Sequence, residues 1–266
     1  MSIVRVDGRT IIRLADIDPD DTGDYSKAEA KPLRREAKDR IEKLQEKLYA
    51  EHRQSLLVVL QAIDTGGKDG TIRHVFSGVN PQGCRVWSFK VPTSWEADHD
   101  IFWRYHQHTP GDGMINIFNR SYYEEVLVVR VKNLVDKSIW EQRYDQINAF
   151  EKILIQNGTR IVKFFLHISK DEQKRRLQAR LDDEARHWKF SSADLKERER
   201  WDDYQEAFDA AINLCSTPEA PWYVIPANNK WYRNFQVAQV IADTLADMDP
   251  QFPPAEEGLD RIRIPD

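Results

Sequence analysis

The sequence predicts an α/β fold with a mostly parallel sheet of five strands, in one domain with an N-terminal helical extension. Two observations predict it. Short apolar runs alternate along the chain with longer stretches of helical periodicity, which is the pattern of βαβ units. The glycine-rich stretch "DTGGKDG" (64–70) joins one apolar run to a helix, as phosphate-binding loops do. The chain shows no repeat of fixed period that would indicate another architecture.

The composition excludes several classes of protein. The chain has 266 residues with 41% hydrophobic and 31% charged residues, enough for one large domain with a sizeable core. No apolar run approaches the roughly 20 residues of a membrane helix, and the N-terminus lacks the apolar part of a signal peptide. Cys84 and Cys215 are therefore expected to be reduced, buried thiols of a cytoplasmic protein without membrane contact. The net charge of −5 offers no global attraction to nucleic acid, so an anionic ligand needs a local basic patch.

The N-terminal part is predicted to be an arm and a helix. Residues 1–25 contain the extended stretch "TIIRLADI" and an acidic turn. From Ser26 to Arg53, Ala, Glu, Lys, Arg and Leu recur at helical spacing, which predicts a long, exposed, charged helix. We expect residues 1–54 to pack on a core formed by residues 55–250, with 251–266 as a tail.

The core begins with a buried strand, because "SLLVVLQAI" (55–63) is continuously apolar and partly β-branched. The loop follows, and a helix is expected to continue until Gly78. The other expected elements are, in order, a strand at 85–91, a helix at 94–108, a strand at 113–121, a helix at 138–156, a strand at 159–168, helices at 170–181 and 192–214, a strand at 221–227 and a helix at 231–248.

The loop departs from the usual phosphate-binding pattern, G-x-x-x-x-G-K-[ST]. Gly66, Gly67 and Lys68 fit it, but Ala62 replaces the first glycine and Asp69 replaces the hydroxyl residue that normally holds Mg²⁺. The simplest alternative is a plain turn with solvated aspartates, which the position between a strand and a helix disfavours.

Asp64 and Asp69 are the candidate replacements for that hydroxyl group. Mg²⁺ prefers one or two carboxylates together with phosphate oxygens and water. Two carboxylates beside phosphates would repel them unless a dication lies between. The acidic residues therefore predict a phosphate site that also binds metal.

A second candidate group, "INIFNRSYYEEV" (115–126), follows the third strand. Ligands of open α/β sheets bind at the carboxyl ends of the strands, which places this group beside the loop. Asn119 stands where phosphate-loop enzymes usually carry a metal-binding aspartate, Arg120 offers donors suited to a phosphoryl group, and Glu124 is a candidate contact. Ser121 and Glu124 also form the pattern of a capping box, and we expect both roles together.

The basic stretch 170–191 is the third candidate group. Such charge runs are usually a solvated helix face. This one occupies the place where small phosphotransferases carry a mobile lid, here expected at about 175–195, with Arg180, Arg186 and Lys189 as its cations and the last two on a loop. Lys230 and Arg233 follow the fifth strand at the same end of the sheet. Four tryptophans are expected to serve packing: Trp188, Trp201, Trp222 and Trp231.

Together, "AIDTGGKDGTIRHVFSGVNPQG", "FNRSYYEEVLVVRV", "LDDEARHWKFSSADLKERERWDDY" and "APWYVIPANNKWYRNF" resemble the polyphosphate kinase 2 family, in order, over most of the chain. The resemblance implies a thymidylate-kinase-like P-loop core, a three-layer sandwich with a helical lid. It also implies Mg²⁺-dependent transfer of a phosphoryl group between inorganic polyphosphate and nucleotides. Mn²⁺ is expected to substitute for Mg²⁺. The partners expected are AMP, ADP, ATP and, as a further option, guanine nucleotides such as GDP, in a dimer or tetramer that binds no nucleic acid.

By its motifs the resemblance assigns the catalytic roles to Asp64, Lys68 and Arg120, and lid positions to Arg180 and Lys189. Whether Asp64 binds the metal or orients the acceptor stays open. Asn119, where many relatives have aspartate, resembles the subgroup that phosphorylates both nucleoside mono- and diphosphates. The candidate phosphate- and nucleotide-binding residues are Thr65, Gly66, Gly67, Asp69, Gly70, Thr71, Arg73, Asn119, Glu124, Lys230 and Arg233.

Two other functions are compatible with the residues alone. An ATP-dependent nucleoside monophosphate kinase on the same fold is disfavoured by the missing hydroxyl residue after Lys68. A non-catalytic sensor of polyphosphate or nucleotides is disfavoured because binding alone would not require Asp64.

Overall fold

The sheet of the computed structural model, which describes residues 3–265, has six strands in the order β1-β6-β5-β2-β4-β3. Five strands run parallel, and β1 pairs with β6 in the antiparallel direction. The strands are β1 Val4–Val6, β2 Ser55–Gln61, β3 Cys84–Ser88, β4 Ile115–Asn119, β5 Thr159–His167 and β6 Trp222–Pro226. The prediction of five strands missed β1, because three residues at a sheet edge carry too short a pattern to identify.

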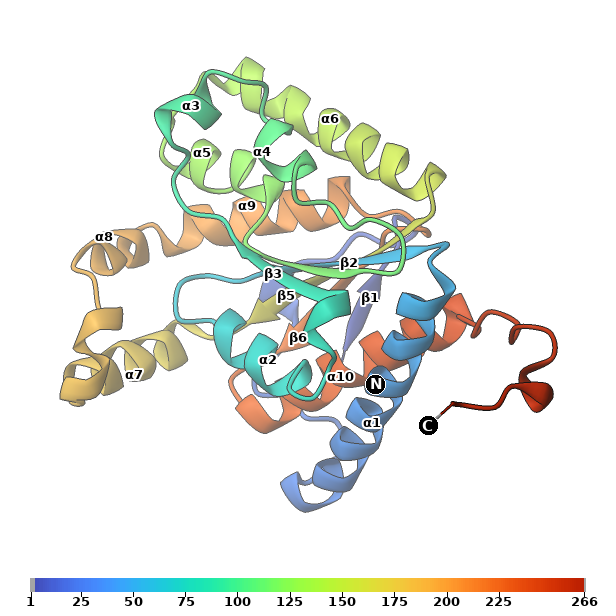
Figure 1. Ribbon diagram of the computed structural model, residues 1–266. Helices are drawn as coiled ribbons and strands as arrows, with labels where there is room; N and C mark the ends of the chain where they lie inside the picture. Colours follow the sequence, from blue (N-terminus) through green and yellow to red (C-terminus); the bar gives the residue numbers. More distant parts are fainter. Residues whose placement is uncertain (1–2, 266) are drawn as a thin grey trace.

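Helices cover both faces of this sheet (Figure 1). The elements on one face include α6 and α9, and those on the other include α1, α2 and α10. Their bounds are α1 Lys27–Glu51, α2 Lys68–Val75, α6 Lys137–Gln156, α9 Trp201–Leu214 and α10 Lys230–Met248. The three-layer α/β sandwich predicted from the sequence is therefore the observed architecture.

Strand β2 lies inside the sheet, between β5 and β4, and this position explains its apolar composition. Leu57 and Val59 point into the core beneath α6 and α9, whereas Leu56, Val58 and Leu60 point into the core beneath α1 and α10. All seven residues of the strand are buried. A strand covered on both faces reads as a continuous apolar run instead of an alternating one.

Helix α1 is less exposed than its charges indicate. Its first turn carries a capping box between Ser26 and Glu29. One face, including Ala37 and Ile41, is buried in the core that also contains residues of α10. The charged residues cover the opposite face. Because its apolar face is buried in the common core, the helix is part of the domain.

Three predicted elements differ from the structure. The helix expected at 94–108 is two short helices, α3 Ser94–Ala97 and α4 Trp103–His106, because the Asp100 side chain accepts a hydrogen bond from the backbone N–H of Phe102 at 2.8 Å. The helix expected at 192–214 bends at Arg200 into α8 Ala193–Glu199 and α9. The loop expected around 186–191 is largely a 3₁₀ helix, Glu184–Lys189, whose N-cap Asp183 accepts from the Ala185 N–H.

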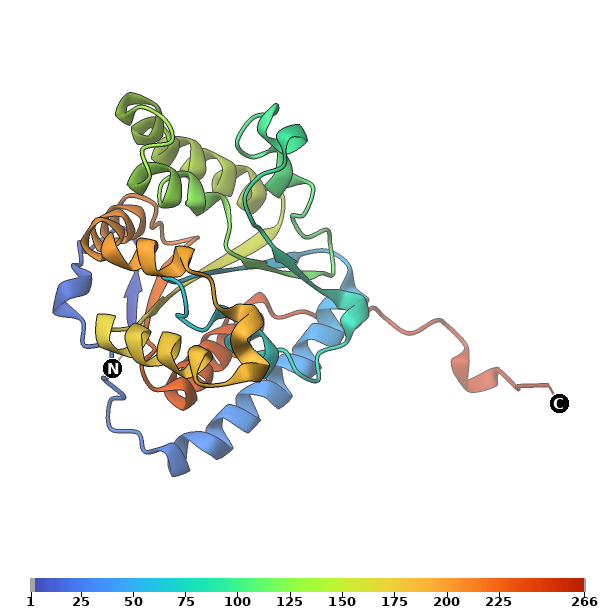
Figure 2. The same ribbon diagram turned by 90° about the vertical axis from the view of Figure 1, so that its left-hand side faces the viewer.

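Two predictions about single residues also need correction. Trp188 is 78% exposed and does not serve packing, whereas Trp201 and Trp222 are buried. Cys215 is a buried free thiol, but Cys84 is only half-buried. The segment after Pro250 runs away from the body of the molecule (Figure 2). No helix in the part of the chain that the structure describes is long and apolar enough to cross a membrane.

Candidate active site

The loop and the "FNRS" turn meet at one edge of the sheet because β2 and β4 are neighbours. Leu60 pairs with Asn119 in the parallel register, so the two strands end side by side. Thr65 (φ 65°) and Arg120 (φ 63°) have left-handed backbone conformations at the two turns. This conformation is costly for residues other than glycine, and it concentrates at functional sites.

Gly67 lets the loop pass over a buried arginine. Its φ is 104°, and a Cβ added there would lie 1.9 Å from Nη1 of Arg233. The guanidinium of Arg233 donates to the Gly66 carbonyl at 3.4 Å and to Oδ1 of Asn234 at 2.8 Å. Burial, with the nearby charge of Arg176, lowers the pKa of Arg233 to about 9. The predicted contact Arg233 therefore lies beneath the loop, where only glycine leaves room for it.

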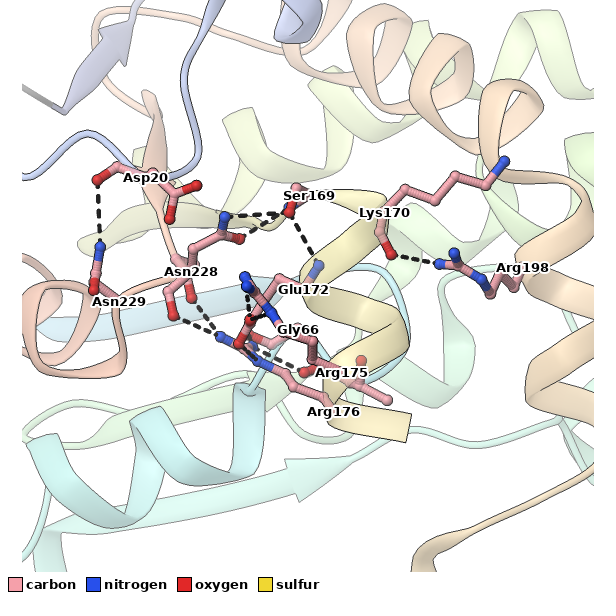
Figure 3. A network of polar contacts seen from close by, with 12 residues as sticks. Asp20, Gly66, Ser169, Lys170, Glu172, Arg175, Arg176, Arg198, Asn228 and Asn229 are labelled. Carbon is pink, nitrogen blue, oxygen red and sulfur yellow. Dashed lines mark hydrogen bonds and ion pairs between the residues drawn. The ribbon is translucent and has the colours of Figure 1, made fainter. Parts of the chain in front are cut away.

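Arg176 is a second cation at the loop, and the sequence did not single it out for the site. It extends from α7 (Lys170–Leu181) and donates to the carbonyls of Thr65 and Gly66 at 3.0 Å each. The same guanidinium donates to the carbonyls of Ala227 at 2.6 Å and Asn228 at 3.2 Å (Figure 3). The available signal was spacing, since Arg176 precedes Arg180 by four residues and shares its helix face.

Lys68 begins α2 and bends back over the loop. Its Nζ donates to the carbonyl of Ala62 at 3.1 Å. Burial, and after it the positive charge of Arg120, lowers the pKa of Lys68 to about 8, while Asp64, Glu124 and Asp69 act in the opposite direction. The Lys68 ammonium group is therefore poorly solvated, and the three carboxylates only partly offset the effects of burial and of Arg120 on its pKa.

Arg120 is held between two carboxylates. Its Nη2 donates to Oδ1 of Asp64 at 2.6 Å, and its Nη1 donates to Oε2 of Glu124 at 3.3 Å. These pairs hold the guanidinium beside the loop and raise the pKa of Arg120, with Glu124 as the main cause. The predicted capping box is half wrong: Ser121 caps the following 3₁₀ turn by accepting from the Tyr123 N–H, but Glu124 binds Arg120.

Asn119 contacts the loop directly. Its Nδ2 donates to Oδ1 of Asp69 at 2.7 Å. An aspartate in this position would place a second carboxylate against Asp69, whereas the amide supplies a donor. With Asn119, the surroundings of Asp69 are therefore less negative than they would be with an aspartate at position 119.

Asp64 and Asp69 are the two carboxylates of the loop that are available to a divalent cation. The contacts described above engage one oxygen of each carboxylate. Within residues 3–265 no three His, Cys, Asp or Glu residues form a group that could hold a metal ion. Two carboxylates next to a phosphate loop suit a dication that takes its other ligands from substrate phosphates and water.

The three cations expected in the lid have their partners within residues 183–194. Arg180 donates to the Lys189 carbonyl at 3.0 Å and to Asp194 at 3.3 Å, so it links α7 to the segments that follow it. Arg186 pairs with Asp183, and Lys189 lies over the ring of Trp188; both cations are exposed. Asp194 was not predicted. Its pKa is raised by burial and by Asp64, which places it within the electrostatic reach of the site.

The remaining predicted contacts lie along α2 and at the start of α10. The Thr71 hydroxyl is buried and donates to the Gly67 carbonyl at 3.1 Å. Gly70 faces Arg233, since an added Cβ would lie 3.4 Å from its Nη2. Arg73 is exposed on α2, and Lys230 is exposed at the first position of α10.

The chain is similar to known proteins over most of its length. The model of the family Polyphosphate kinase 2 (PPK2) matches residues 24–253. The AMP/ADP-polyphosphate phosphotransferase of Meiothermus ruber is 54% identical over 263 residues, which cover 98% of both chains. The ADP-polyphosphate phosphotransferase of Rhodopseudomonas palustris is 47% identical over 240 residues, covering 86% of this chain and 83% of that protein. The crystal structure of Polyphosphate Kinase 2 from Arthrobacter aurescens TC1 superposes with a TM-score of 0.91 at 45% identity, covering 94% of this chain and 90% of that one.

Proposed function

The chain belongs to the polyphosphate kinase 2 family and is a polyphosphate:nucleotide phosphotransferase, and we propose that it phosphorylates both AMP and ADP. The observation that carries the catalytic assignment is the ion pair of Arg120 with Asp64 beside the loop, close enough to Lys68 for both charges to act on its pKa. The similar protein of Meiothermus ruber is named for both nucleotides, which supports the two acceptors. Phosphorylation of ADP then gives ATP, and GDP is proposed as a further acceptor.

The proposed reaction is an in-line transfer. A terminal phosphorus of polyphosphate loses its bond to the bridging oxygen and forms a bond to a phosphate oxygen of AMP or ADP. The shortened polyphosphate keeps the electrons of the broken bond. Since such transfers pass through a loose transition state, catalysis depends on positioning and charge neutralisation.

The residues of the loop would carry this neutralisation. Backbone N–H groups of the loop and the N-terminus of α2 face the donor phosphate. Lys68 and Arg120 would bind oxygens of the transferred group. Arg176 and Arg233 occupy loop carbonyls and so keep the loop in its conformation.

Asp64 and Asp69 would hold Mg²⁺, with Mn²⁺ as a substitute. When bound, the ion supplies positive charge that offsets the charge of the phosphate chain. Asn119 donates a hydrogen bond to Asp69 and is neutral, so this end of the site carries one negative charge fewer than it would with an aspartate at position 119. We connect that difference with the acceptance of AMP as well as ADP.

We further propose that residues 55–250 form the catalytic core, that residues 1–54 pack on it and that the tail is 251–266. The lid at about 175–195 would close over the donor and bring Arg180, Arg186 and Lys189 toward its phosphates. A dimer or tetramer and a cytoplasmic location stay predictions, the first testable by light scattering on the purified protein.

The test supplies AMP, ADP and GDP separately, with long-chain polyphosphate and Mg²⁺ but without ATP, and separates the products by chromatography. AMP should yield ADP and ATP, and both Lys68→Ala and Asp64→Asn should be inactive. Asn119→Asp should retain activity with ADP and lose it with AMP. Reaction of ADP alone in the wild-type protein would contradict the two-acceptor proposal.

A further inference from the structure

The core beneath α6 and α9 contains a buried ion pair. Lys163 of β5 and Glu151 of α6 are 0% and 2% exposed, and Nζ of Lys163 donates to Oε2 of Glu151 at 2.6 Å. The ammonium group also donates to the Cys215 carbonyl at 2.6 Å and to the Tyr123 hydroxyl at 3.0 Å, so each of its three N–H groups has an acceptor. Burying two charges carries a desolvation cost, and an apolar pair of similar volume is often as stabilising or more so. Stability alone therefore does not explain this pair.

The ion pair holds two consecutive tyrosines. The hydroxyls of Tyr122 and Tyr123 both donate to Oε1 of Glu151, at 2.9 Å and 2.8 Å, and both side chains are fully buried. Burial, and after it the charge of Glu151, raises the pKa of each hydroxyl well above its usual value, so both stay protonated donors. A fully satisfied buried network of this kind specifies one arrangement of its members. Glu151, held in turn by Lys163, therefore fixes the orientation of both tyrosine rings.

These tyrosines anchor the turn that carries Arg120. They begin the 3₁₀ helix Tyr122–Glu125, which also contains Glu124, the partner of Arg120. On the other side of the turn, the backbone N–H of Arg120 donates to the Leu60 carbonyl at 3.1 Å. Between these two anchors Arg120 has a left-handed backbone, with φ at 63°. Such a conformation is costly and persists only where the surrounding structure holds it.

We propose that the buried Glu151–Lys163 pair positions Arg120 for phosphoryl transfer, acting through the two tyrosines of the turn. The inference rests on the proposed function, in which Arg120 binds the transferred group. A shift of the 3₁₀ helix would move Arg120 and Glu124 together, away from Asp64 and the loop. Since a displacement of about 1 Å at a reacting centre can lower the rate roughly 10²-fold, a small movement of this turn is enough to impair catalysis.

The test exchanges the pair in two ways, both free of buried charge. Glu151→Leu with Lys163→Met removes the acceptor of both tyrosine hydroxyls, whereas Glu151→Gln with Lys163→Met keeps a side-chain oxygen for them. With ADP and long-chain polyphosphate, well below the Tm, kcat of the first variant should fall roughly 10- to 100-fold while both KM values stay unchanged. The second variant should keep kcat within about threefold of the wild-type value, because its amide still accepts from the tyrosines. A purely structural pair would change the Tm and leave kcat unaltered.

A further variant tests the same link without touching the ion pair. Tyr122→Phe with Tyr123→Phe keeps both rings and removes only the hydroxyls, so it answers the question even if the exchanged pair prevents folding. It should also lower kcat, with both KM values unchanged. The matched control is Tyr144→Phe, on α6 and in the same core, whose hydroxyl accepts from Arg130 at 3.2 Å. This control should keep the wild-type kcat.

Two results would overturn the positioning role. One is a wild-type kcat in the folded Glu151→Leu, Lys163→Met protein or in the variant that lacks both tyrosine hydroxyls. The other is an equal loss of kcat in the leucine and glutamine variants of position 151. An Arg120→Ala protein that keeps its kcat would instead refute the role of Arg120 in the proposed function, so the two failures are distinguishable.

Discussion

Replacing Lys68 by methionine should stabilise the ligand-free protein while it removes activity. The lysine loses solvation in the folded state, where its pKa falls from 10.5 to about 8. Since one pKa unit corresponds to about 1.36 kcal/mol, the charged side chain costs the folded state about 3 kcal/mol at pH 7. The lost hydrogen bond to Ala62 offsets about 1 kcal/mol of this. The variant should therefore gain about 2 kcal/mol, a rise in Tm of roughly 4–8 °C for a chain of this size.

The stability difference between the wild-type protein and Lys68→Met should depend on pH, because the pKa of Lys68 is lower in the folded state. Between pH 8 and 10.5 the unfolded state holds a proton on Lys68 that the folded state has released, so the stability of the wild-type protein rises with pH relative to the variant. At pH 10 the cost of the lysine falls below about 1 kcal/mol, and the difference in Tm should nearly disappear.

The assay is thermal unfolding of both proteins at pH 7 and pH 10, in buffer free of phosphate and metal ions. Lys174→Met, on the exposed face of α7, serves as the control and should match the wild-type protein at both pH values. A Lys68→Met variant that melts at or below the wild-type temperature at pH 7, or a difference that persists at pH 10, would refute the reasoning. Phosphoryl transfer by the variant should fall by roughly 10²–10⁴.

Three further predictions concern the same edge of the sheet. Arg120→Ala should lower kcat by roughly 10²–10⁴, measured with ADP and long-chain polyphosphate, with little change in Tm. Gly67→Ala should destabilise the protein by roughly 1–3 kcal/mol in denaturant unfolding, because its Cβ would collide with Arg233 in a left-handed backbone, whereas Gly111→Ala, in open space, should be neutral. Arg176→Met should cost at least about 2 kcal/mol in the same assay and raise the KM for polyphosphate, since it removes a donor from four carbonyls, of which Gly66 keeps only its 3.4 Å contact with Arg233; unchanged values would show that the loop holds its shape unaided.

Most of the fold was predictable because its elements carry strong local patterns. The end of helix α7 at Leu181 and the strand before the loop follow from periodicity and apolar composition over contiguous residues. The two helices that break where none was expected share one cause. The bends at Asp100 and Arg200 depend on a single side-chain hydrogen bond or a single backbone angle, which helical periodicity does not reveal.

The site, like the fold, has parts that the sequence predicted and parts that it did not. The loop and the "FNRS" turn were predictable, because a strand, its terminal residues and the next helix are consecutive in sequence. The pairing of Arg120 with Glu124 in place of a capping box was not, because Glu124 stands four residues after Arg120 and three after Ser121, and both spacings allow a side-chain contact.

The sequence by itself determined the α/β class, the phosphate loop and the family of this protein, since each is a property of consecutive residues. Only the tertiary structure decided which cations support the loop. Arg176 and Arg233 reach Gly66 across 110 and 167 residues, and Asn119 reaches Asp69 across 50. Such contacts depend on the order of strands in the sheet and on which helix faces are buried. Those follow from the packing of the whole chain, whose energetics no local pattern contains.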